Sequence, residues 1–146
     1  MKIYLDTSVY NRPFDDQTQP RIWLETLALA IILQYVEAGE ATLINSSVLE
    51  YENSRNPFSV RQDWMAKCLK LATEYRRVDE LIRQRAENLG KHGLKAMDAL
   101  HVSCAEATDA DFFLTCDKRL LNKQKHIKVK SMNPLDFVQK KIGEAP

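Results

Sequence analysis

Short apolar runs alternate with helix-length segments along the chain, and this alternation restricts the fold more than any other feature. The strand-like runs are Lys2–Leu5, Thr42–Asn45, Asp111–Thr115 and Ile127–Ser131, with a weaker one at Arg76–Val78. Short apolar strands are typical of parallel sheets that are buried on both faces. Because segments long enough for helices separate them, the sequence predicts βαβ units. The predicted fold class is therefore α/β, with a mostly parallel central sheet.

Proline, glycine and capping residues predict where the helices begin and end. Pro20 suits the first turn of a helix that reaches about Ala38 and ends at Gly39. The other helices are expected from Ser47 onward, from Pro57 or Ser59 to about Glu74, from Asp79 to about Leu89, from about Lys95 to Thr108, and after Pro134. All of them fall between strand-like runs or after the last one, as an α/β fold requires.

Length and composition predict a single cytoplasmic domain over residues 1–146. The chain is long enough for one core, and its net charge of +1 means that a nucleic acid would be bound by a local patch. The three cysteines are widely spaced without a CxxC pair, which favours reduced thiols, and the three histidines are scattered. No secretion leader is evident, and the longest apolar run is too short to span a membrane.

Acidic residues occur where this architecture places binding sites, at the carboxyl ends of the strands. Asp6 and Asp117 each follow a strand-like run, and Asp98 lies in the first turn of a helix, at the edge of its apolar stripe. Each acid alone is explained by helix capping or by the helix dipole. Together they would raise one another's pKa unless a cation neutralised them. An all-oxygen set of this kind suits Mg²⁺ or Mn²⁺.

Two glutamates compete for a fourth position in this set. Ser47 and Glu50 have the spacing of a capping box, which gives Glu50 a structural explanation. Glu52 lies on the same helical face as Val48 and Leu49, where a carboxylate has no such explanation. The sequence therefore favours Glu52, with Glu50 as the alternative.

Four segments carry a family resemblance: "YLDTSV", "SSVLEYE", "KAMDALHVSCAEA" and "ADFFLTCDKRLL". In this order, and over nearly the whole chain, they resemble the PIN-domain family, which includes the VapC-type toxins of bacteria and archaea. The resemblance implies a three-layer α/β/α fold, an acidic pocket with one or two divalent ions, and cleavage of RNA. It also implies the catalytic and metal-binding residues, which are Asp6, Glu52 (or Glu50), Asp98 and Asp117.

The same resemblance implies partners, although one segment departs from the toxin branch. "NRPFDDQTQPR" is longer and more polar than the usual stretch after the first motif, which suggests a branch whose cellular role need not be that of a toxin. The resemblance still includes the toxin of a toxin–antitoxin pair among the expected roles. Relatives use their early helices to form a homodimer or to receive an antitoxin. The segment Pro20–Ala38 carries a stripe of large apolar residues, namely Trp23, Leu24, Leu27, Ile31 and Tyr35. Core packing is the default expectation for this stripe, and the alternative is that part of it is exposed to a second copy of the chain or to an antitoxin.

The reaction expected of these residues is metal-assisted hydrolysis of a phosphodiester bond. Hydroxyl groups of Thr7, Ser8 and Thr115 are candidates to support the acids by hydrogen bonds, although cap or turn roles explain each of them singly. RNA phosphates require cations, and the candidates are Arg12, Lys118, Arg119 and Lys123. A charged run of this kind otherwise forms a solvated face.

Other functional classes fit less well. An aspartyl-phosphate phosphatase usually has a second acid two residues after the nucleophile, where this chain has Ser8, and a receiver domain needs an acidic pair that "LDTSV" lacks. The remaining alternative is a non-catalytic PIN-like module that binds RNA or protein. Loss of an acid would favour that alternative, and all four acids are present.

Overall fold

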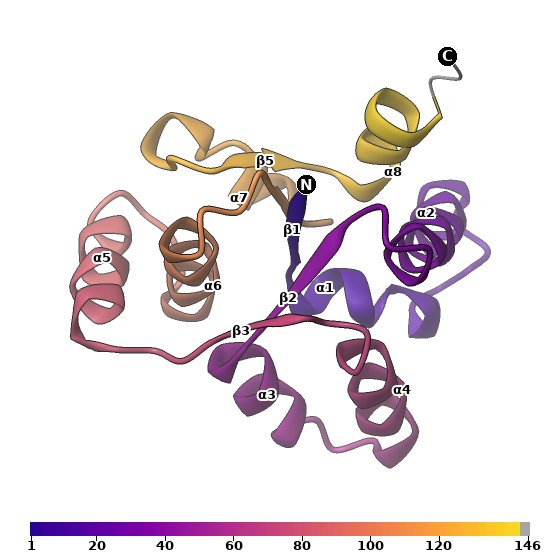
Figure 1. Ribbon diagram of the computed structural model, residues 1–146, viewed down its shortest axis with the longest axis horizontal. Helices are drawn as coiled ribbons and strands as arrows, with labels where there is room; N and C mark the ends of the chain where they lie inside the picture. The colour runs from indigo at the N-terminus through magenta and orange to yellow at the C-terminus, as the bar shows by residue number, and fades with distance from the viewer. Residues whose placement is uncertain (144–146) are drawn as a thin grey trace.

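The computed structural model describes residues 1–143 and has a five-stranded sheet in which all neighbouring strands are parallel (Figure 1). The strands are β1 (Lys2–Leu5), β2 (Thr42–Ser46), β3 (Glu74–Arg76), β4 (Phe112–Leu114) and β5 (Lys130–Met132). Their order across the sheet is β3-β2-β1-β4-β5. The predicted α/β class is confirmed.

The helices form the outer layers of the fold. They are α1 (Thr7–Tyr10), α2 (Pro20–Glu37), α3 (Ser47–Ser54), α4 (Ser59–Leu69), α5 (Glu80–Gly90), α6 (Ala96–Ala107), α7 (Lys118–Leu121) and α8 (Pro134–Phe137). Shorter turns are η1 (Arg12–Phe14), η2 (Gln124–His126) and η3 (Val138–Ile142). In Figure 1, α5 and α6 pack together on one side of the sheet, while α2 and α8 pack together on the other. None of these helices is long and apolar enough to cross a membrane.

The order of the strands creates a switch point beside β1. The chain runs outward from β1 to β2 and β3, then returns to add β4 on the opposite side of β1. Because parallel crossovers are right-handed, this reversal puts the connecting helices on both faces of the sheet. Ligands of such sheets bind where the strand order reverses, at the carboxyl ends of the strands. Here that place is the end of β1 and β4.

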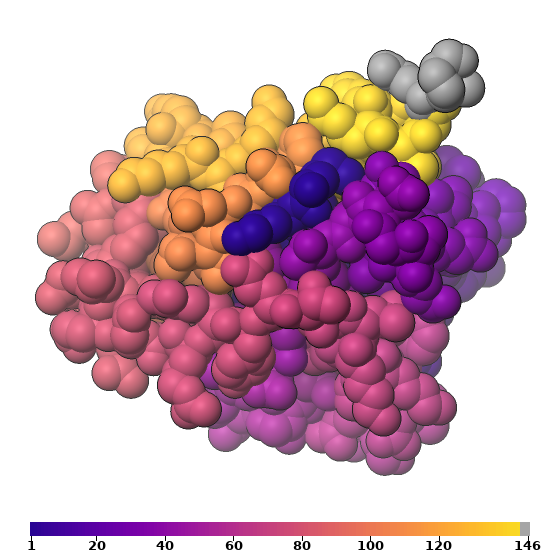
Figure 2. Space-filling model, viewed as in Figure 1, coloured from indigo at the N-terminus to yellow at the C-terminus, as the bar shows by residue number. Residues whose placement is uncertain are grey.

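The central strand is completely covered. Ile3, Tyr4 and Leu5 have no exposed surface, and Tyr4 stacks on Phe113 of β4 with ring centroids 5.6 Å apart. The opposite end of β1 reaches the surface, where the amino-terminal residues (indigo in Figure 2) lie between the segments that lead into β2 and β4. The carboxyl ends of all five strands therefore lie at the other edge of the sheet.

Three predicted boundaries are wrong, each because of a tertiary contact. The last strand begins at Lys130 rather than Ile127, because the Gln124 side chain donates to the Ile127 and Val129 carbonyls that a longer strand would use. The third strand ends before Val78, whose N–H donates to Ser47 Oγ at 3.0 Å. The preceding helix ends at Leu69 rather than near Glu74, which itself begins β3.

The expected core stripe of α2 is also wrong. Trp23 is 51% exposed, and Leu24, Leu27 and Ile31 are exposed with it, whereas Tyr35 is partly buried. The buried face consists of Ile22, Glu25, Ala28, Leu29, Ile32, Leu33 and Val36. Because α2 is apolar around most of its circumference, residue spacing alone could not show which side faces the sheet.

Candidate functional site

Asp6 stands at the switch point, directly after β1. Its N–H donates to the Leu114 carbonyl of β4 at 3.0 Å, which extends the ladder between the two strands. Its carboxylate caps α1 by accepting hydrogen bonds from the N–H and the hydroxyl of Ser8. The residue is only 4% exposed, and burial raises the pKa of Asp6 despite hydrogen bonds from Ser8 and Thr115. A carboxylate in this position is costly to ionise without a nearby cation.

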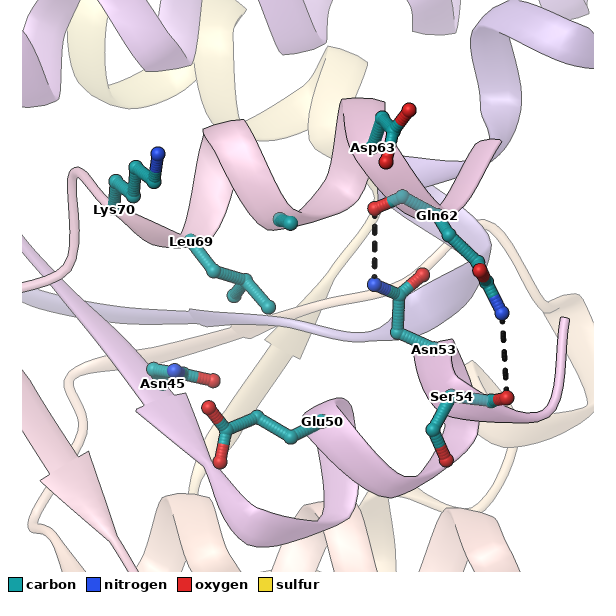
Figure 3. A pocket seen from close by; sticks show the side chains of 9 residues that line it. Asn45, Glu50, Asn53, Ser54, Gln62, Asp63, Leu69 and Lys70 are labelled. Carbon is teal, nitrogen blue, oxygen red and sulfur yellow. Dashed lines mark hydrogen bonds between the residues drawn. The ribbon is translucent and has the colours of Figure 1, made fainter. Parts of the chain in front are cut away.

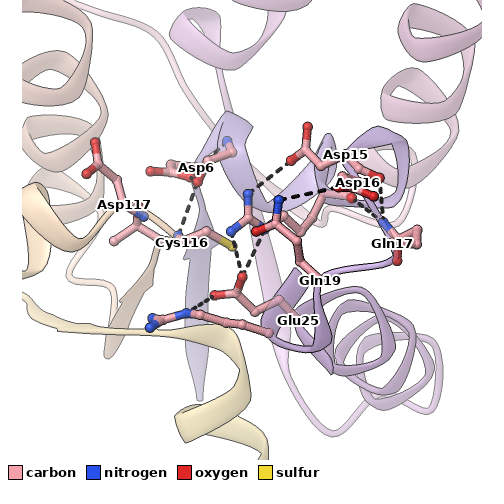
Figure 4. Close-up of polar contacts among 12 residues, drawn as sticks. Asp6, Asp15, Asp16, Gln17, Gln19, Glu25, Cys116 and Asp117 are labelled. Atoms are coloured by element: carbon pink, nitrogen blue, oxygen red, sulfur yellow. Dashed lines mark hydrogen bonds and ion pairs between the residues drawn. The ribbon is translucent and has the colours of Figure 1, made fainter. Parts of the chain in front are cut away.

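The end of β4 is tied to the end of β1 through hydroxyl groups. Ser8 Oγ accepts a hydrogen bond from the Cys116 N–H at 3.2 Å, and Thr115 Oγ1 accepts one from the Asp117 N–H at 3.0 Å. Asp117 then caps α7 by accepting from the Arg119 N–H at 2.9 Å. Figure 4 shows Asp6, Cys116 and Asp117 at neighbouring strand ends.

Asp98 approaches from α6 and shares a cleft of about 400 Å³ with Asp117. Burial raises the pKa of Asp98 to about 6, and the negative charges of Asp6, Asp117 and Glu52 add to this increase. The other three acids therefore act electrostatically on Asp98, although the four come from four separate segments. Several carboxylates that repel one another in a partly buried site are common where a protein binds a ligand or carries out catalysis.

Glu52 is held in place from two directions. Its Oε1 accepts a hydrogen bond from Thr7 Oγ1 at 2.6 Å and another from His101 Nε2. Burial acts to raise the pKa of Glu52, but these hydrogen bonds and the charge of His101 outweigh it and lower the pKa. Both bonds go to Oε1, which leaves Oε2 available to a ligand.

Glu50 lies on a different side of α3. Its Oε1 accepts a hydrogen bond from the Tyr75 hydroxyl at 2.7 Å, and it lines a separate cleft of about 570 Å³ between α3 and α4 (Figure 3). The predicted capping box is wrong, because Ser46 rather than Ser47 caps α3, accepting from the Leu49 N–H at 3.1 Å. Of the two glutamates, Glu52 is the one that the structure brings to Thr7.

Sequence reasoning missed His101, which is 2% exposed. Its Nδ1 shares a hydrogen bond with the Tyr4 hydroxyl at 2.7 Å, and Tyr4 shares another of 2.7 Å with Ser46 Oγ. A buried polar chain thus runs from Ser46 at the end of β2 through Tyr4 of β1 and His101 of α6 to the carboxylate of Glu52. The available signal was the position of His101 three residues after Asp98, on the same face of the same helix.

The predicted RNA-contacting residues divide into two groups. Arg12 is engaged internally, because it donates to Glu25 Oε1 at 2.7 and 2.9 Å and to Asp15 at 3.0 Å (Figure 4). Glu25 is only 1% exposed, and burial acts to raise its pKa, but hydrogen bonds from Asn133 and Arg12 lower it. Lys118 and Arg119 are exposed on α7.

Lys123 and Arg119 line the same cleft as Asp98 and Asp117, together with Lys95, which sequence reasoning missed. The structure therefore brings basic side chains from two segments beside the acids. Lys95 lies directly before α6, so its proximity to Asp98 in the chain was the available signal.

The acids fit a hard divalent cation by their chemistry. Their free atoms are carboxylate oxygens, the ligands that Mg²⁺ and Mn²⁺ prefer. Within residues 1–143, no three His, Cys, Asp or Glu side chains lie close enough to form a preformed metal cluster. A cation among these acids would neutralise the repulsion that raises the pKa of Asp98.

Comparison with known proteins gives both a family and a fold. A profile of the PIN domain matches residues 3–126, whereas no sequence among the curated proteins matches the chain. The crystal structure of FitAcB from Neisseria gonorrhoeae is similar at a TM-score of 0.52 and 22% identity, over 90% of this chain and 97% of that one. VapBC2 from Rickettsia felis, bound to a DNA fragment from their promoter, is similar at a TM-score of 0.58 and 16% identity, over 91% and 98% of the two chains. At these identities the structural likeness concerns the fold.

Proposed function

The chain belongs to the PIN-domain family, whose members are generally nucleases that use divalent metals, and we propose that it hydrolyses phosphodiester bonds of RNA. The observation that carries this proposal is that Asp98 and Asp117 share a cleft near the switch point of the sheet, where Asp6 also acts electrostatically on Asp98. The raised pKa of Asp98, about 6, reflects burial and the charges of the neighbouring acids. Such a group of acids is stabilised by a cation that also binds substrate.

Asp6, Asp98 and Asp117 hold Mg²⁺ or Mn²⁺ in this proposal, and Glu52 completes the ligand set through Oε2. When bound, the ion polarises the scissile phosphate and lowers the pKa of the attacking water. Thr7 and His101 fix the orientation of Glu52 by their bonds to Oε1. Ser8 fixes Asp6 and also binds the backbone before Asp117, so its hydroxyl sets the spacing of the two strand ends.

Lys118, Arg119 and Lys123 provide the positive charge that draws the RNA backbone toward the acids. Arg12 supports the site indirectly, because its ion pair with Glu25 anchors the segment after Asp6 to α2. The remaining hydroxyl, Thr115, holds the turn that presents Asp117.

The cellular context proposed for this activity is a toxin–antitoxin pair in the cytoplasm. The resemblance to VapC-type toxins and the likeness of the fold to VapBC2 and FitAcB support an antitoxin partner. The exposed apolar residues of α2 provide a surface for the antitoxin or for a second copy of the chain. All three cysteines are buried free thiols, in keeping with a reducing compartment.

The deciding experiment incubates the purified protein with mixed single-stranded RNA in Mg²⁺, in Mn²⁺ or in EDTA, beside the variant Asp6→Asn. We expect cleavage in either metal, none in EDTA, and none with the variant. RNA binding without cleavage under all conditions would contradict the proposal and favour a non-catalytic RNA-binding module.

A further inference from the structure

The cleft shared by Asp98 and Asp117 carries more positive than negative charge. Three basic side chains line it with the two acids, namely Lys95, Arg119 and Lys123. At about 400 Å³ it lies within the range of about 300–1,000 Å³ that is typical of small-ligand sites. Its walls come from the turn before α6 and from the segment around α7, so it extends from the acids toward the α5 side of the molecule.

These three cations differ from three arginines elsewhere in the fold that are paired with carboxylates. Arg12, Arg76 and Arg85 each form a salt bridge with a carboxylate at 2.7–2.8 Å. Within residues 1–143, the side chains of Lys95, Arg119 and Lys123 form no salt bridge and no hydrogen bond, and Arg119 is bound to Asp117 through its backbone N–H alone. Uncommitted cations in a cleft are available to phosphate oxygens, which arginine and lysine bind with charge-assisted hydrogen bonds.

Gly93 lies close to one of these cations. Its φ of +94° is a conformation that residues with side chains rarely adopt. A Cβ atom at this position would lie 2.9 Å from Lys123 Nζ. The ammonium group of Lys123 therefore lies close to the backbone of Gly93, in space that a side chain at position 93 would occupy.

Two stacked imidazole rings stand beside Gly93. The rings of His92 and His126 are nearly parallel, with centroids 4.1 Å apart and an interplanar angle of 15°. Arg85 Nη2 donates to the His126 carbonyl at 2.9 Å and is itself paired with Glu106, which anchors the inner ring. The His92 ring is an exposed aromatic surface, and His92 directly precedes Gly93, which lines the cleft. Unpaired bases stack on such surfaces in RNA-binding proteins.

We infer that this cleft binds the nucleotide next to the cleaved bond, with its phosphate on Lys95, Arg119 and Lys123 and its base stacked on His92. The inference rests on the proposed function, because it takes RNA as the substrate. It adds that the RNA is single-stranded at this position, since a base inside a duplex cannot stack on a side chain.

The test measures binding of a 5′-labelled 12-nucleotide single-stranded RNA to the full chain by fluorescence anisotropy at several salt concentrations. The parent protein is Asp6→Asn in Mg²⁺, with the RNA checked for integrity on a gel. The variants add Arg119→Ala with Lys123→Ala, or His92→Ala, and the matched control adds Lys67→Ala on the exposed side of α4. Circular dichroism confirms that each variant is folded.

The double variant should bind at least about tenfold more weakly, and its slope of log K against log salt should shrink by about 1.4, or about 0.7 for each lost phosphate contact. His92→Ala should lose about fivefold or more with little change in slope, and His92→Phe should restore binding. Binding of an RNA duplex should not depend on His92. Lys67→Ala should stay within about twofold of the parent.

Unchanged binding by the folded double variant would overturn the inference, and so would a His92 effect of equal size on duplex RNA. If wild-type protein still cleaves RNA in that case, the proposed function stands and the inference alone fails. A parent protein that binds no RNA, together with a wild type that cleaves none, overturns both.

Discussion

Two clefts border the helices around the switch point, and their polar groups are used differently. In the larger one, about 570 Å³ between α3 and α4, Gln62 donates to the Ser54 and Asn56 carbonyls and Asn53 donates to the Gln62 carbonyl (Figure 3). Glu50 is bound there by Tyr75. In the smaller one, about 400 Å³, Asp98 and Asp117 share the cleft with three basic side chains that have no ion pair in the described chain.

Because the larger cleft is also lined by Asp63 and Lys70, which form no ion pair in the described chain, unpaired charge alone does not identify the site. The difference lies in the charges of neighbouring acids, which raise the pKa of Asp98 in the smaller cleft. The hydrogen bonds of the larger cleft join α3 to α4 and therefore contribute to folding. The acids of the smaller cleft repel one another, so they reduce the stability of the metal-free protein. Groups that oppose folding without an evident structural gain are typical of binding and catalytic sites.

The largest expected effect separates the two clefts by activity. Asp98→Asn should reduce RNA cleavage by about a thousandfold or more, because losing several kcal/mol of metal-dependent stabilisation corresponds to such a factor. Glu50→Gln is the matched control and should change the rate by less than about twofold. Rates are measured at saturating Mn²⁺ with one RNA. A large loss with Glu50→Gln would reverse the comparison and make the larger cleft the site.

The next effect concerns His101 of α6, which is hydrogen-bonded to Glu52 of α3. His101→Ala removes a charge-assisted hydrogen bond from Glu52 and leaves the Tyr4 hydroxyl with Ser46 as its one remaining partner in the described chain. We expect the free energy of unfolding to fall by about 2–4 kcal/mol and Mn²⁺ affinity to fall about 10–100-fold. Urea unfolding and calorimetry measure the two quantities.

Tyr4→Phe is the control for that variant, because it keeps the ring stacked on Phe113 and the bond from His101 to Glu52. It should lower stability by about 1–2 kcal/mol while leaving Mn²⁺ affinity within about threefold of wild type. Equal losses of affinity in both variants would show that His101 acts through the core rather than through Glu52.

The contrast between α2 and β1 shows how far the sequence predicts this fold. The apolar run of β1 and the acid after it are local features, so both the buried strand and the position of Asp6 could be predicted. The exposed face of α2 could not, because apolar residues surround the helix and only the tertiary contacts of Ile32 and Leu33 select the buried side. The burial of Glu25 could not be predicted either, since it depends on Arg12 and on Asn133, which is 108 residues away.

The sequence likewise predicts some residues of the candidate site and not others. The three aspartates follow from strand ends and from one helix start, which are positions in the chain. The partnership of Glu52 with His101 joins residues 49 positions apart, and neither residue type nor spacing indicates it. Lys95 has an evident place near Asp98, but only the folded loop shows that it shares a cleft with Lys123.

A smaller effect, on the free energy of unfolding, tests the raised pKa of Asp98, which burial and the neighbouring acids cause. The pKa of Asp98 is raised from 3.8 to about 6, so its ionised form is less favourable in the folded protein than in the unfolded chain. In EDTA, this group should lower the free energy of unfolding by about 1–2 kcal/mol as pH rises from 3.8 to about 6, after allowance for its partial exposure. Above that range its contribution should stay level.

The measurement is the difference in urea unfolding between wild type and Asp98→Asn across this pH range. The variant should be the more stable protein above pH 6 and should lose that advantage near pH 4. Mn²⁺ should cancel the advantage at neutral pH, because binding to the folded wild type alone stabilises it. A difference that does not change with pH would show that the acids do not act on Asp98.

The smallest effect returns to the larger cleft. Gln62→Ala removes two side-chain hydrogen bonds, of 3.2 Å to Ser54 and 2.7 Å to Asn56, that hold the end of α3 against α4. Because both carbonyls belong to partly exposed segments and can bind water instead, we expect a loss of only about 1 kcal/mol in the free energy of unfolding. Cleavage of RNA per folded molecule should be unchanged. A selective loss of activity without loss of stability would mean that this cleft also contacts substrate, and the division between a structural and a functional cleft would not hold.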